Sequence, residues 1–290
     1  MRFDQPNNRI YIRQSWLNDL IICPERARFK LAKPNMSGAS DATIMGTAVH
    51  AGIESYLKGE IPIDQIGTVA MLAWKELLEQ PFKTTNLNMA DAPQQIVSMC
   101  EAWSTKIAPQ VQLGGDVEHK FSFHLNMEYE GWDIWCEGTM DYVQPDGVIW
   151  DWKTASRTYY AKEKQSQAIQ PTVYAAALHY ERQMEYPIEF RYGVMIRQDT
   201  PKAQVVSINR TYEHSRWLMH TIKPAVLTAL RLGVDNENSW VINDTTALCS
   251  EKWCDYWSLC KGAFLSPSAL SLPMQTSVTI SNVDTKSTTD

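Results

Sequence analysis

The feature that most constrains the fold is a short β-hairpin predicted around residues 144–147, because it would bring two acidic side chains face to face. This segment reads Gln-Pro-Asp-Gly, and Pro-Asp-Gly suits a type I turn followed by a glycine in the left-handed region. If Val143 pairs with Ile149, Asp141 lies directly opposite Asp151. Side chains opposed in this way are about 4.5–5.5 Å apart at Cβ, where like charges destabilise the sheet. A divalent cation held between the two carboxylates would offset that repulsion.

The second strand of this hairpin reads Ile-Trp-Asp-Trp-Lys. Alternation places Ile149, Asp151 and Lys153 on one face and Trp150 and Trp152 on the other, so the lysine points to the predicted metal side. Mg²⁺ and Mn²⁺ prefer hard oxygen ligands, commonly one or two carboxylates with water and phosphate. The pattern Asp-x-Lys is too short to be specific alone, and a buried hairpin that happens to carry two acids is the alternative.

Three further elements carry candidate site residues. His50 lies on a predicted helix over residues 46–57, on a different face from its apolar stripe. Glu118 lies on the polar side of a strand-like stretch. Gln170 and Tyr174 open an apolar, alanine-rich helix, although a polar residue at a helix start is also common and Pro171 favours a position at the cap for Gln170.

In this order, the elements resemble the RecB-like branch of the PD-(D/E)XK nuclease superfamily. That branch shows a histidine on an early helix, a glutamate, an aspartate after Gly-x-x, an Asp/Glu-x-Lys strand and a Gln-x-x-x-Tyr helix. The resemblance implies an α/β protein with a restriction-endonuclease-like mixed central β-sheet flanked by helices. It also implies metal-assisted hydrolysis of phosphodiester bonds, in which Mg²⁺ or Mn²⁺ lowers the pKa of bound water and polarises the phosphate.

The resemblance assigns roles residue by residue. The metal ligands would be His50, Asp141, Asp151 and the backbone carbonyl of Trp152. The catalytic set would be Asp141, Asp151, Lys153, Glu118, Gln170 and Tyr174. Lys153 would position water or phosphate and act electrostatically, since a lysine near two carboxylates stays protonated. Gln170 and Tyr174 would contact the DNA backbone or orient Lys153.

Four cysteines form a second pattern. Cys23 precedes a proline near the start of the chain, and Cys249, Cys254 and Cys260 lie close together near its end. This arrangement resembles the iron-sulfur subgroup of RecB-like nucleases, which includes the CRISPR-associated exonucleases and the AddB nuclease domain. In that subgroup four thiolates bind a [4Fe-4S] cluster that clasps the N- and C-terminal parts together. The subgroup commonly shows C-x2-C-x5-C at the late positions, whereas this chain has C-x4-C-x5-C.

Other uses of the cysteines remain open. Zn²⁺ also binds four thiolates, and ordinary buried thiols are a further alternative. Disulfides are disfavoured, because the chain shows no signal peptide and reads as intracellular. Cys100 has helical neighbours and Cys136 lies beside the hairpin, so both are expected in the core.

The pattern along the chain predicts an N-terminal helical part over residues 1–35, in which Ser15 caps a helix over 16–23. The nuclease core would cover 36–240, with a helical insertion over 60–112 and a late helix over 214–233 interrupted at Pro224. The cysteine cluster would occupy 241–265. The tail over 266–290 is rich in serine and threonine and is expected to be disordered.

Charge and hydropathy bound the partners. A formal net charge of −6 gives no global basic footprint, although basic residues gather locally in ways that suit phosphate contacts. We expect DNA as the partner, single-stranded by resemblance, with a recombination or CRISPR-adaptation protein as a further partner. No membrane span is expected, and the predicted location is cytoplasmic. A non-catalytic DNA-binding module and an adaptor protein remain alternatives to the exonuclease.

Overall fold

The computed structural model describes residues 1–36, 38–85, 87–167, 169–236 and 239–265. They belong to two compact units, Met1–Thr246 and a second unit that begins at Ala247, and each is described by itself. The tail predicted to be disordered lies outside the described residues.

The first unit is built on one mixed sheet of seven strands in its described part. The strand order is β1-β2-β4-β5-β6-β7, and β3 pairs with β4 beside this path. The pairs β2–β4 and β5–β6 are parallel, and the others are antiparallel. The strands are β1 (Arg2–Asp4), β2 (Arg9–Arg13), β3 (Asp116–Tyr129), β4 (Trp132–Val143), β5 (Ile149–Ala155), β6 (Ile188–Ile196) and β7 (Ala203–Arg210).

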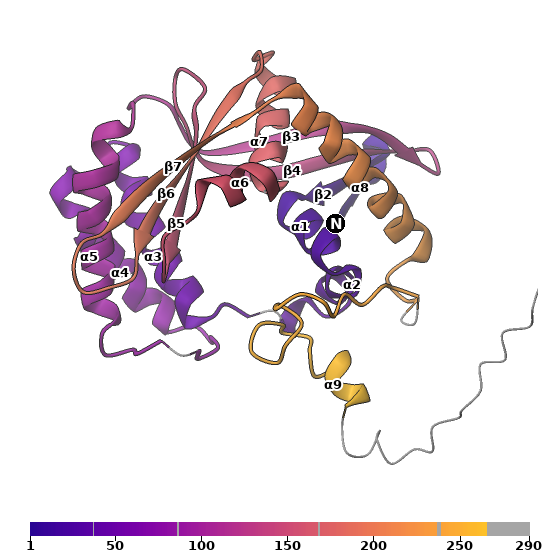
Figure 1. Ribbon diagram of the computed structural model, residues 1–290, viewed down its shortest axis with the longest axis horizontal. Coiled ribbons are helices and arrows are strands. Elements are labelled where there is room, and N and C mark those ends of the chain that lie inside the picture. Colours follow the sequence, from indigo (N-terminus) through magenta and orange to yellow (C-terminus); the bar gives the residue numbers. More distant parts are fainter. Residues whose placement is uncertain (37, 86, 168, 237–238, 266–290) are drawn as a thin grey trace, which may run out of the picture. The chain divides into compact units, whose positions relative to one another are not determined.

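Helices cover both faces of this sheet (Figure 1). One face packs on α1 (Gln14–Ile22), α7 (Ile169–Arg182) and α8 (Tyr212–Leu232), and we call the buried cluster there the α7-side core. The other face packs on α3 (Asp41–Leu57), α4 (Ile66–Leu78) and α5 (Ala92–Ala102), and we call its cluster the α3-side core. The shorter helices are α2 (Pro24–Ala32) and α6 (Ala161–Gln167), and a π-helical turn, Trp103–Ile107, continues α5. A mixed α/β sheet flanked by helices, with helices in the predicted insertion, confirms the expected fold class.

The predicted hairpin between β4 and β5 is confirmed, with the register expected from the sequence. Val143 pairs with Ile149 and Tyr142 with Trp150, and these are the only two residue pairs recorded between the two strands in the described chain. Beyond them β4 continues beside β2 and β3, whereas β5 continues beside β6. Figure 1 shows β3 and β4 diverging there from β5, β6 and β7. The sheet therefore forks immediately after the hairpin.

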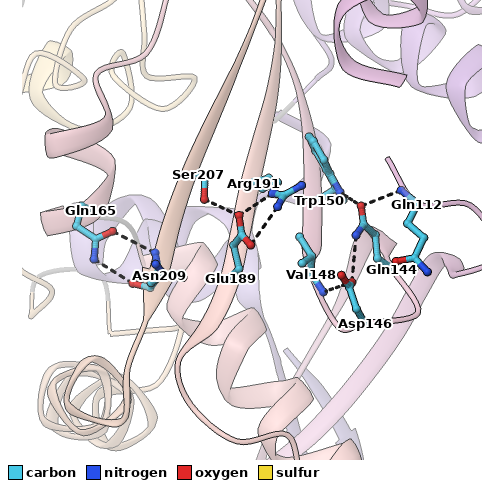
Figure 2. Close-up of polar contacts among 10 residues, drawn as sticks. All are labelled: Gln112, Gln144, Asp146, Val148, Trp150, Gln165, Glu189, Arg191, Ser207 and Asn209. Atoms are coloured by element: carbon cyan, nitrogen blue, oxygen red, sulfur yellow. Dashed lines mark hydrogen bonds and ion pairs between the residues drawn. The ribbon is translucent and has the colours of Figure 1, made fainter. Parts of the chain in front are cut away.

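The hairpin turn is held by the side chain of Gln144, which is 3% exposed (Figure 2). Its Oε1 accepts hydrogen bonds from Trp150 Nε1 at 2.6 Å and from the Gln112 backbone N–H at 3.1 Å. Its Nε2 donates to Asp146 Oδ1 at 3.0 Å, and the same oxygen accepts the N–H of Val148 at 3.2 Å. Gly147, with φ of 88°, supplies the left-handed residue that the Pro-Asp-Gly pattern predicts.

Three features differ from the sequence-based expectations. Strands β1 and β2 were not predicted, because both are short, β1 pairs only with β2 in the described chain, and β2 joins the sheet by pairing with the distant strand β4. The helix α1 begins at Gln14 rather than after Ser15, and its N-cap residue Arg13 provides no side-chain cap. The helix α8 is not interrupted at Pro224, since buried Ile222 and Val226 hold it against the sheet on both sides of the proline.

The second unit carries the three late cysteines. The Cys254 N–H donates to the Ser250 carbonyl at 2.9 Å and the Cys260 N–H to the Tyr256 carbonyl at 3.0 Å, just before the short helix α9 (Lys261–Phe264). No disulfide joins any of the six cysteines in the described structure. Among the helices that the structure describes, none combines the length and the apolar character needed to cross a membrane.

Candidate active site

The two acidic residues predicted to face each other lie at the fork of the sheet. The register that ends at Tyr142 and Trp150 brings Asp141 and Asp151 to the first position past the paired segment. The Asp141 Oδ2 accepts the Trp152 backbone N–H at 2.7 Å, so the aspartate side chain bridges to β5 where no residue pair between the strands is recorded. Burial, and then the charge of Asp151, raise the pKa of Asp141, and His50, Lys153 and the Trp152 N–H oppose this shift.

His50 lies near the same carboxylate. It lies on α3, whose Ser40 N-cap accepts the Thr43 N–H at 3.1 Å and whose Val49 and Ile53 are buried in the α3-side core. The His50 Nδ1 is 3.7 Å from Asp141 Oδ2. The predicted histidine helix is therefore confirmed, and it points its imidazole at the fork.

Lys153 follows Asp151 on the same face of β5, and its ammonium contacts Asp151 Oδ2. That oxygen is buried, and the ammonium of Lys153 is its ion-pair partner among the described residues. Burial lowers the pKa of Lys153, but the charges of Asp151 and Asp141 more than offset this effect, and the net shift is upward. Lys153 therefore carries its charge at neutral pH, as expected from two neighbouring carboxylates.

Gln170 and Tyr174 form a chain of contacts that ends on Asp151. The Gln170 Nε2 donates to Asp151 Oδ1 at 3.0 Å and lies 3.1 Å from the Tyr174 hydroxyl, which donates to the Thr139 carbonyl at 2.8 Å. Both residues lie in the first two turns of α7. Gln170 thus contacts the aspartate rather than Lys153, which the sequence analysis had considered as its partner.

Glu118 lies beside Asp141 on the third strand of the site. The pairs Val117–Tyr142 and His119–Met140 flank it, so the register brings Glu118 opposite Asp141. Its φ of 50° interrupts the regular strand at this point. Burial, and then the charges of Asp141 and Glu54, raise the pKa of Glu118 to about 7.

These residues supply oxygen and imidazole donors, the types that bind Mg²⁺ and Mn²⁺ in proteins. In the described part of the chain, no group of three or more His, Cys, Asp or Glu side chains is arranged to hold a metal ion. The ammonium of Lys153 balances the charge of Asp151 instead. The buried Asp151 Oδ2, without a hydrogen bond, has the chemistry of a ligand for a hard cation.

A cavity of about 410 Å³ opens beside this cluster between α3 and β5. Its lining includes Gly46, Thr47, His50, Lys153 and Thr154. A Cβ at Gly46 would lie 3.0 Å from Thr154 Oγ1, so glycine allows the helix and the strand to approach closely here. His50 and Lys153 therefore line a cavity beside the two aspartates.

Of the predicted cluster cysteines, Cys23 belongs to the first unit. It separates α1 from α2, with its N–H donating to the Asp19 carbonyl at 2.8 Å. The chain returns to this point near the end of the unit, where Val241 accepts the Glu25 N–H at 3.1 Å and Asn243 donates to the Ile22 carbonyl at 2.7 Å. Cys100 and Cys136 are buried in the two cores, as predicted.

Two contributors to the site were not predicted. The backbone carbonyl of Thr139 accepts the hydrogen bond of the Tyr174 hydroxyl, and the sequence carries no signal for such a backbone contact. Gln144 supports the hairpin, and the only available signal was a polar residue directly before Pro-Asp-Gly.

Comparison with known proteins agrees with this arrangement. A family model described as the PD-(D/E)XK nuclease superfamily matches residues 14–261. A crystal structure from Eubacterium rectale described as a "Putative exonuclease" has a TM-score of 0.51 at 15% identity, covering 86% of this chain and 92% of that chain. The structure of SSO0001 has a TM-score of 0.40 at 12% identity, covering 90% of this chain and 89% of that chain. No curated protein matches significantly.

The family model spans the fork, the hairpin and both helices that carry site residues, and the Eubacterium rectale structure shares the fold. The restriction-endonuclease-like fold expected from the sequence is therefore confirmed. The chain belongs to the PD-(D/E)XK nuclease superfamily.

Proposed function

We propose that this protein is a metal-dependent deoxyribonuclease that degrades single-stranded DNA from an end. The observation that carries the proposal is the pair of aspartates at the fork, contacted by a protonated lysine and approached by His50. Membership of a nuclease superfamily supports phosphodiester hydrolysis as the reaction. The Eubacterium rectale structure, described as a "Putative exonuclease", supports attack from an end.

In this proposal Asp141, Asp151, the Trp152 carbonyl and His50 hold Mg²⁺ or Mn²⁺, and Glu118 supports the ligands. Bound metal supplies an activated water and polarises the scissile phosphate. Gln170 fixes the orientation of Asp151 through its hydrogen bond, and Tyr174 in turn fixes Gln170.

The charges of the site explain why Lys153 acts through position rather than as a base. Its raised pKa keeps the ammonium protonated, so it holds an anionic phosphate or orients the attacking water. Lys153 lines the same cavity as His50, so a substrate group in that cavity would lie beside both residues.

We also propose that Cys23, Cys249, Cys254 and Cys260 bind a [4Fe-4S] cluster, with Zn²⁺ as the alternative. All four side chains are partly exposed, whereas Cys100 and Cys136 are buried, so the four have access to a metal. The hydrogen bonds of Val241 and Asn243 hold this part of the first unit beside the α1–α2 junction, where Cys23 lies. Absorbance near 400 nm and iron analysis after anaerobic purification test the cluster, and zinc without iron would contradict it.

The test of the nuclease uses end-labelled single-stranded DNA and the anaerobically purified protein with Mn²⁺. Wild type should shorten the strand, and Lys153→Ala and an EDTA sample should not. Lys223→Ala, which removes an exposed lysine from α8, is the matched control and should retain activity. If folded, metal-loaded wild type leaves the DNA intact, the proposed function is wrong for this substrate.

A further inference from the structure

A second cavity, of about 550 Å³, lies on the α7 side of the candidate active site. It is enclosed by the start of α1, by β3 and by β4. The residues on its wall that carry the argument are Arg13, Gln14, Lys120, Glu137, Thr139 and Tyr174. Thr139 and Tyr174 also belong to the chain of contacts that orients Asp151, so this cavity adjoins the proposed catalytic residues.

Gln14 is the most informative residue of the cavity. It is 8% exposed, and its amide makes no hydrogen bond with any residue that the structure describes. Its Cβ packs beside Gly138, where an added Cβ would lie 3.5 Å away, so the polar end is directed toward the cavity that it lines. Its amide atoms are not among the buried polar atoms that lack a partner in the described chain, so the amide reaches the solvent of the cavity, where it can donate a hydrogen bond to a ligand.

The start of α1 adds hydrogen-bond donors at the same place. This nine-residue helix begins at Gln14, and its N-cap Arg13 gives no side-chain hydrogen bond to the first turn. Ser15 also lines the cavity. Backbone N–H groups at a helix N-terminus, together with the helix dipole, favour an anion.

The charges around the cavity favour the same kind of ligand. Arg13 and Lys120 line it, and Lys120 is exposed with no ion pair to a described residue. Among the described residues of the wall Glu137 is the one carboxylate, and it is paired with Arg2 at 2.8 Å and lies 4.0 Å from Arg13. The wall is therefore cationic in a protein whose formal net charge is −6.

The position of the cavity relates it to the reaction. Thr139 precedes Asp141 by two residues on β4, which is about 7 Å along a strand. We propose that the cavity binds a phosphate of the substrate strand next to the scissile one, held by the Gln14 amide, the first turn of α1, Arg13 and Lys120. This inference rests on the proposed nuclease function. The contact would fix which phosphate of the DNA strand lies at the catalytic residues. The phosphate is an internal phosphodiester or a terminal phosphate, and the test below separates the two.

The first measurement is binding of a labelled single-stranded oligonucleotide in EDTA, which prevents turnover, at several salt concentrations. Lys120→Gln should flatten the slope of log affinity against log salt by about 0.7, the value for one lost contact to a single strand. Gln14→Leu, which keeps the side-chain volume, should weaken binding by roughly 5- to 10-fold. Lys223→Gln makes the same charge change on exposed α8 and should alter neither quantity.

The second measurement locates the phosphate. Each phosphate of the oligonucleotide is replaced in turn by an uncharged methylphosphonate, and binding is compared between wild type and Lys120→Gln. At one position the replacement should weaken wild type by several-fold and leave Lys120→Gln almost unchanged. An equal response of both proteins at every position would overturn the inference. Oligonucleotides with and without a 5′- or 3′-phosphate test for a terminal group. If the cavity binds a terminal phosphate, removing that phosphate should weaken binding to wild type and leave binding to Lys120→Gln almost unchanged.

The two proposals fail in different ways. If wild type binds and cleaves but Lys120→Gln and Gln14→Leu behave as wild type, the phosphate site is wrong and the nuclease stands. If wild type neither binds nor cleaves the strand, the proposed function fails, and the phosphate site fails with it. Lys120 is exposed, so its variant keeps the test decisive even if Gln14→Leu does not fold.

Discussion

The two cores on opposite faces of the sheet are built from different lengths of chain. The α3-side core is formed almost entirely between Ile44 and Trp152, and four of its members are tryptophans. The α7-side core extends from Ile10 to Trp240 and joins the first strands to the last helix. The candidate active site lies between the two cores, because His50 is on α3, which packs in the first core, and Gln170 and Tyr174 are on α7, which packs in the second. The site therefore depends on both cores, one built largely from a continuous stretch of chain and the other from segments far apart in the sequence.

The largest expected effect concerns Asp141, at the fork of the sheet. Asp141→Asn should reduce the cleavage rate by at least about 1,000-fold, which is roughly 4 kcal/mol of transition-state stabilisation. Its stability in EDTA at neutral pH should be equal to or greater than that of wild type. The pKa of Asp141 is higher in the folded state than in the unfolded state, so at a pH above the unfolded-state pKa the ionised carboxylate lowers the free energy of unfolding. The uncharged amide of asparagine removes this destabilisation. Cleavage rates and thermal unfolding test both parts.

Asp133→Asn is the matched control, since this aspartate is on the same strand and its side chain is 54% exposed. It should leave both activity and stability unchanged. A large loss of stability in Asp141→Asn would show that its carboxylate is structural rather than functional.

The next prediction compares the cores directly. Trp103→Ala in the α3-side core and Phe190→Ala in the α7-side core should each lower the free energy of unfolding by about 3–5 kcal/mol, because both side chains are fully buried. The Trp103 ring lies 5.6 Å from that of Trp152, and the Phe190 ring 6.1 Å from that of Tyr174, so both changes should also reduce cleavage. Denaturant unfolding and a cleavage assay supply the data. A loss below 1 kcal/mol at either position would mean that its core contributes little to the stability of the sheet.

A third prediction asks whether the unexpected strand β2 belongs to the core. Ile12→Ala should lower the free energy of unfolding by about 2–5 kcal/mol, because Ile12 is fully buried and pairs with Cys136. Ile63→Ala, at a residue that is 38% exposed, is the control and should change stability by less than about 0.5 kcal/mol. Equal effects at the two positions would show that β2 contributes little to the stability of the sheet.

The smallest of the four effects is expected at the hairpin turn. Gln144→Leu leaves Trp150 Nε1 and the Gln112 N–H without their acceptor, which should cost about 1–3 kcal/mol. The exposed Gln110 provides the control for the same substitution. Hydrogen exchange of the Val148 and Trp152 amides should quicken only in the Gln144 variant. Unchanged exchange would show that the turn holds its shape without this side chain.

The same contrast explains how much the sequence could predict. The hairpin register, the faces of Asp151 and Trp152 and the helix of His50 follow from short-range patterns, and all of them are confirmed. The pairing of β2 with β4 does not follow, because five residues of strand carry no information about a partner far along the chain. The start of α1 was misplaced for the same reason, since the preceding strand fixes it. Helix propensity alone also gave the wrong answer at Pro224, where packing on the sheet outweighs the lost hydrogen bond.

The parallel pairing of β2 with β4 has a consequence for the order in which the molecule assembles. Arg9 pairs with Asp133, so this contact closes a loop of more than a hundred residues, whereas the β4–β5 hairpin closes within a few. The entropy of loop closure makes the former costlier by roughly 3 kcal/mol. During synthesis the first strands emerge early, yet β2 has only β1 beside it until β4 has been made. The wall of the second cavity that carries Gln14 therefore joins the sheet only after the helices α3–α5 have left the ribosome, so this cavity cannot form before β4 has been made.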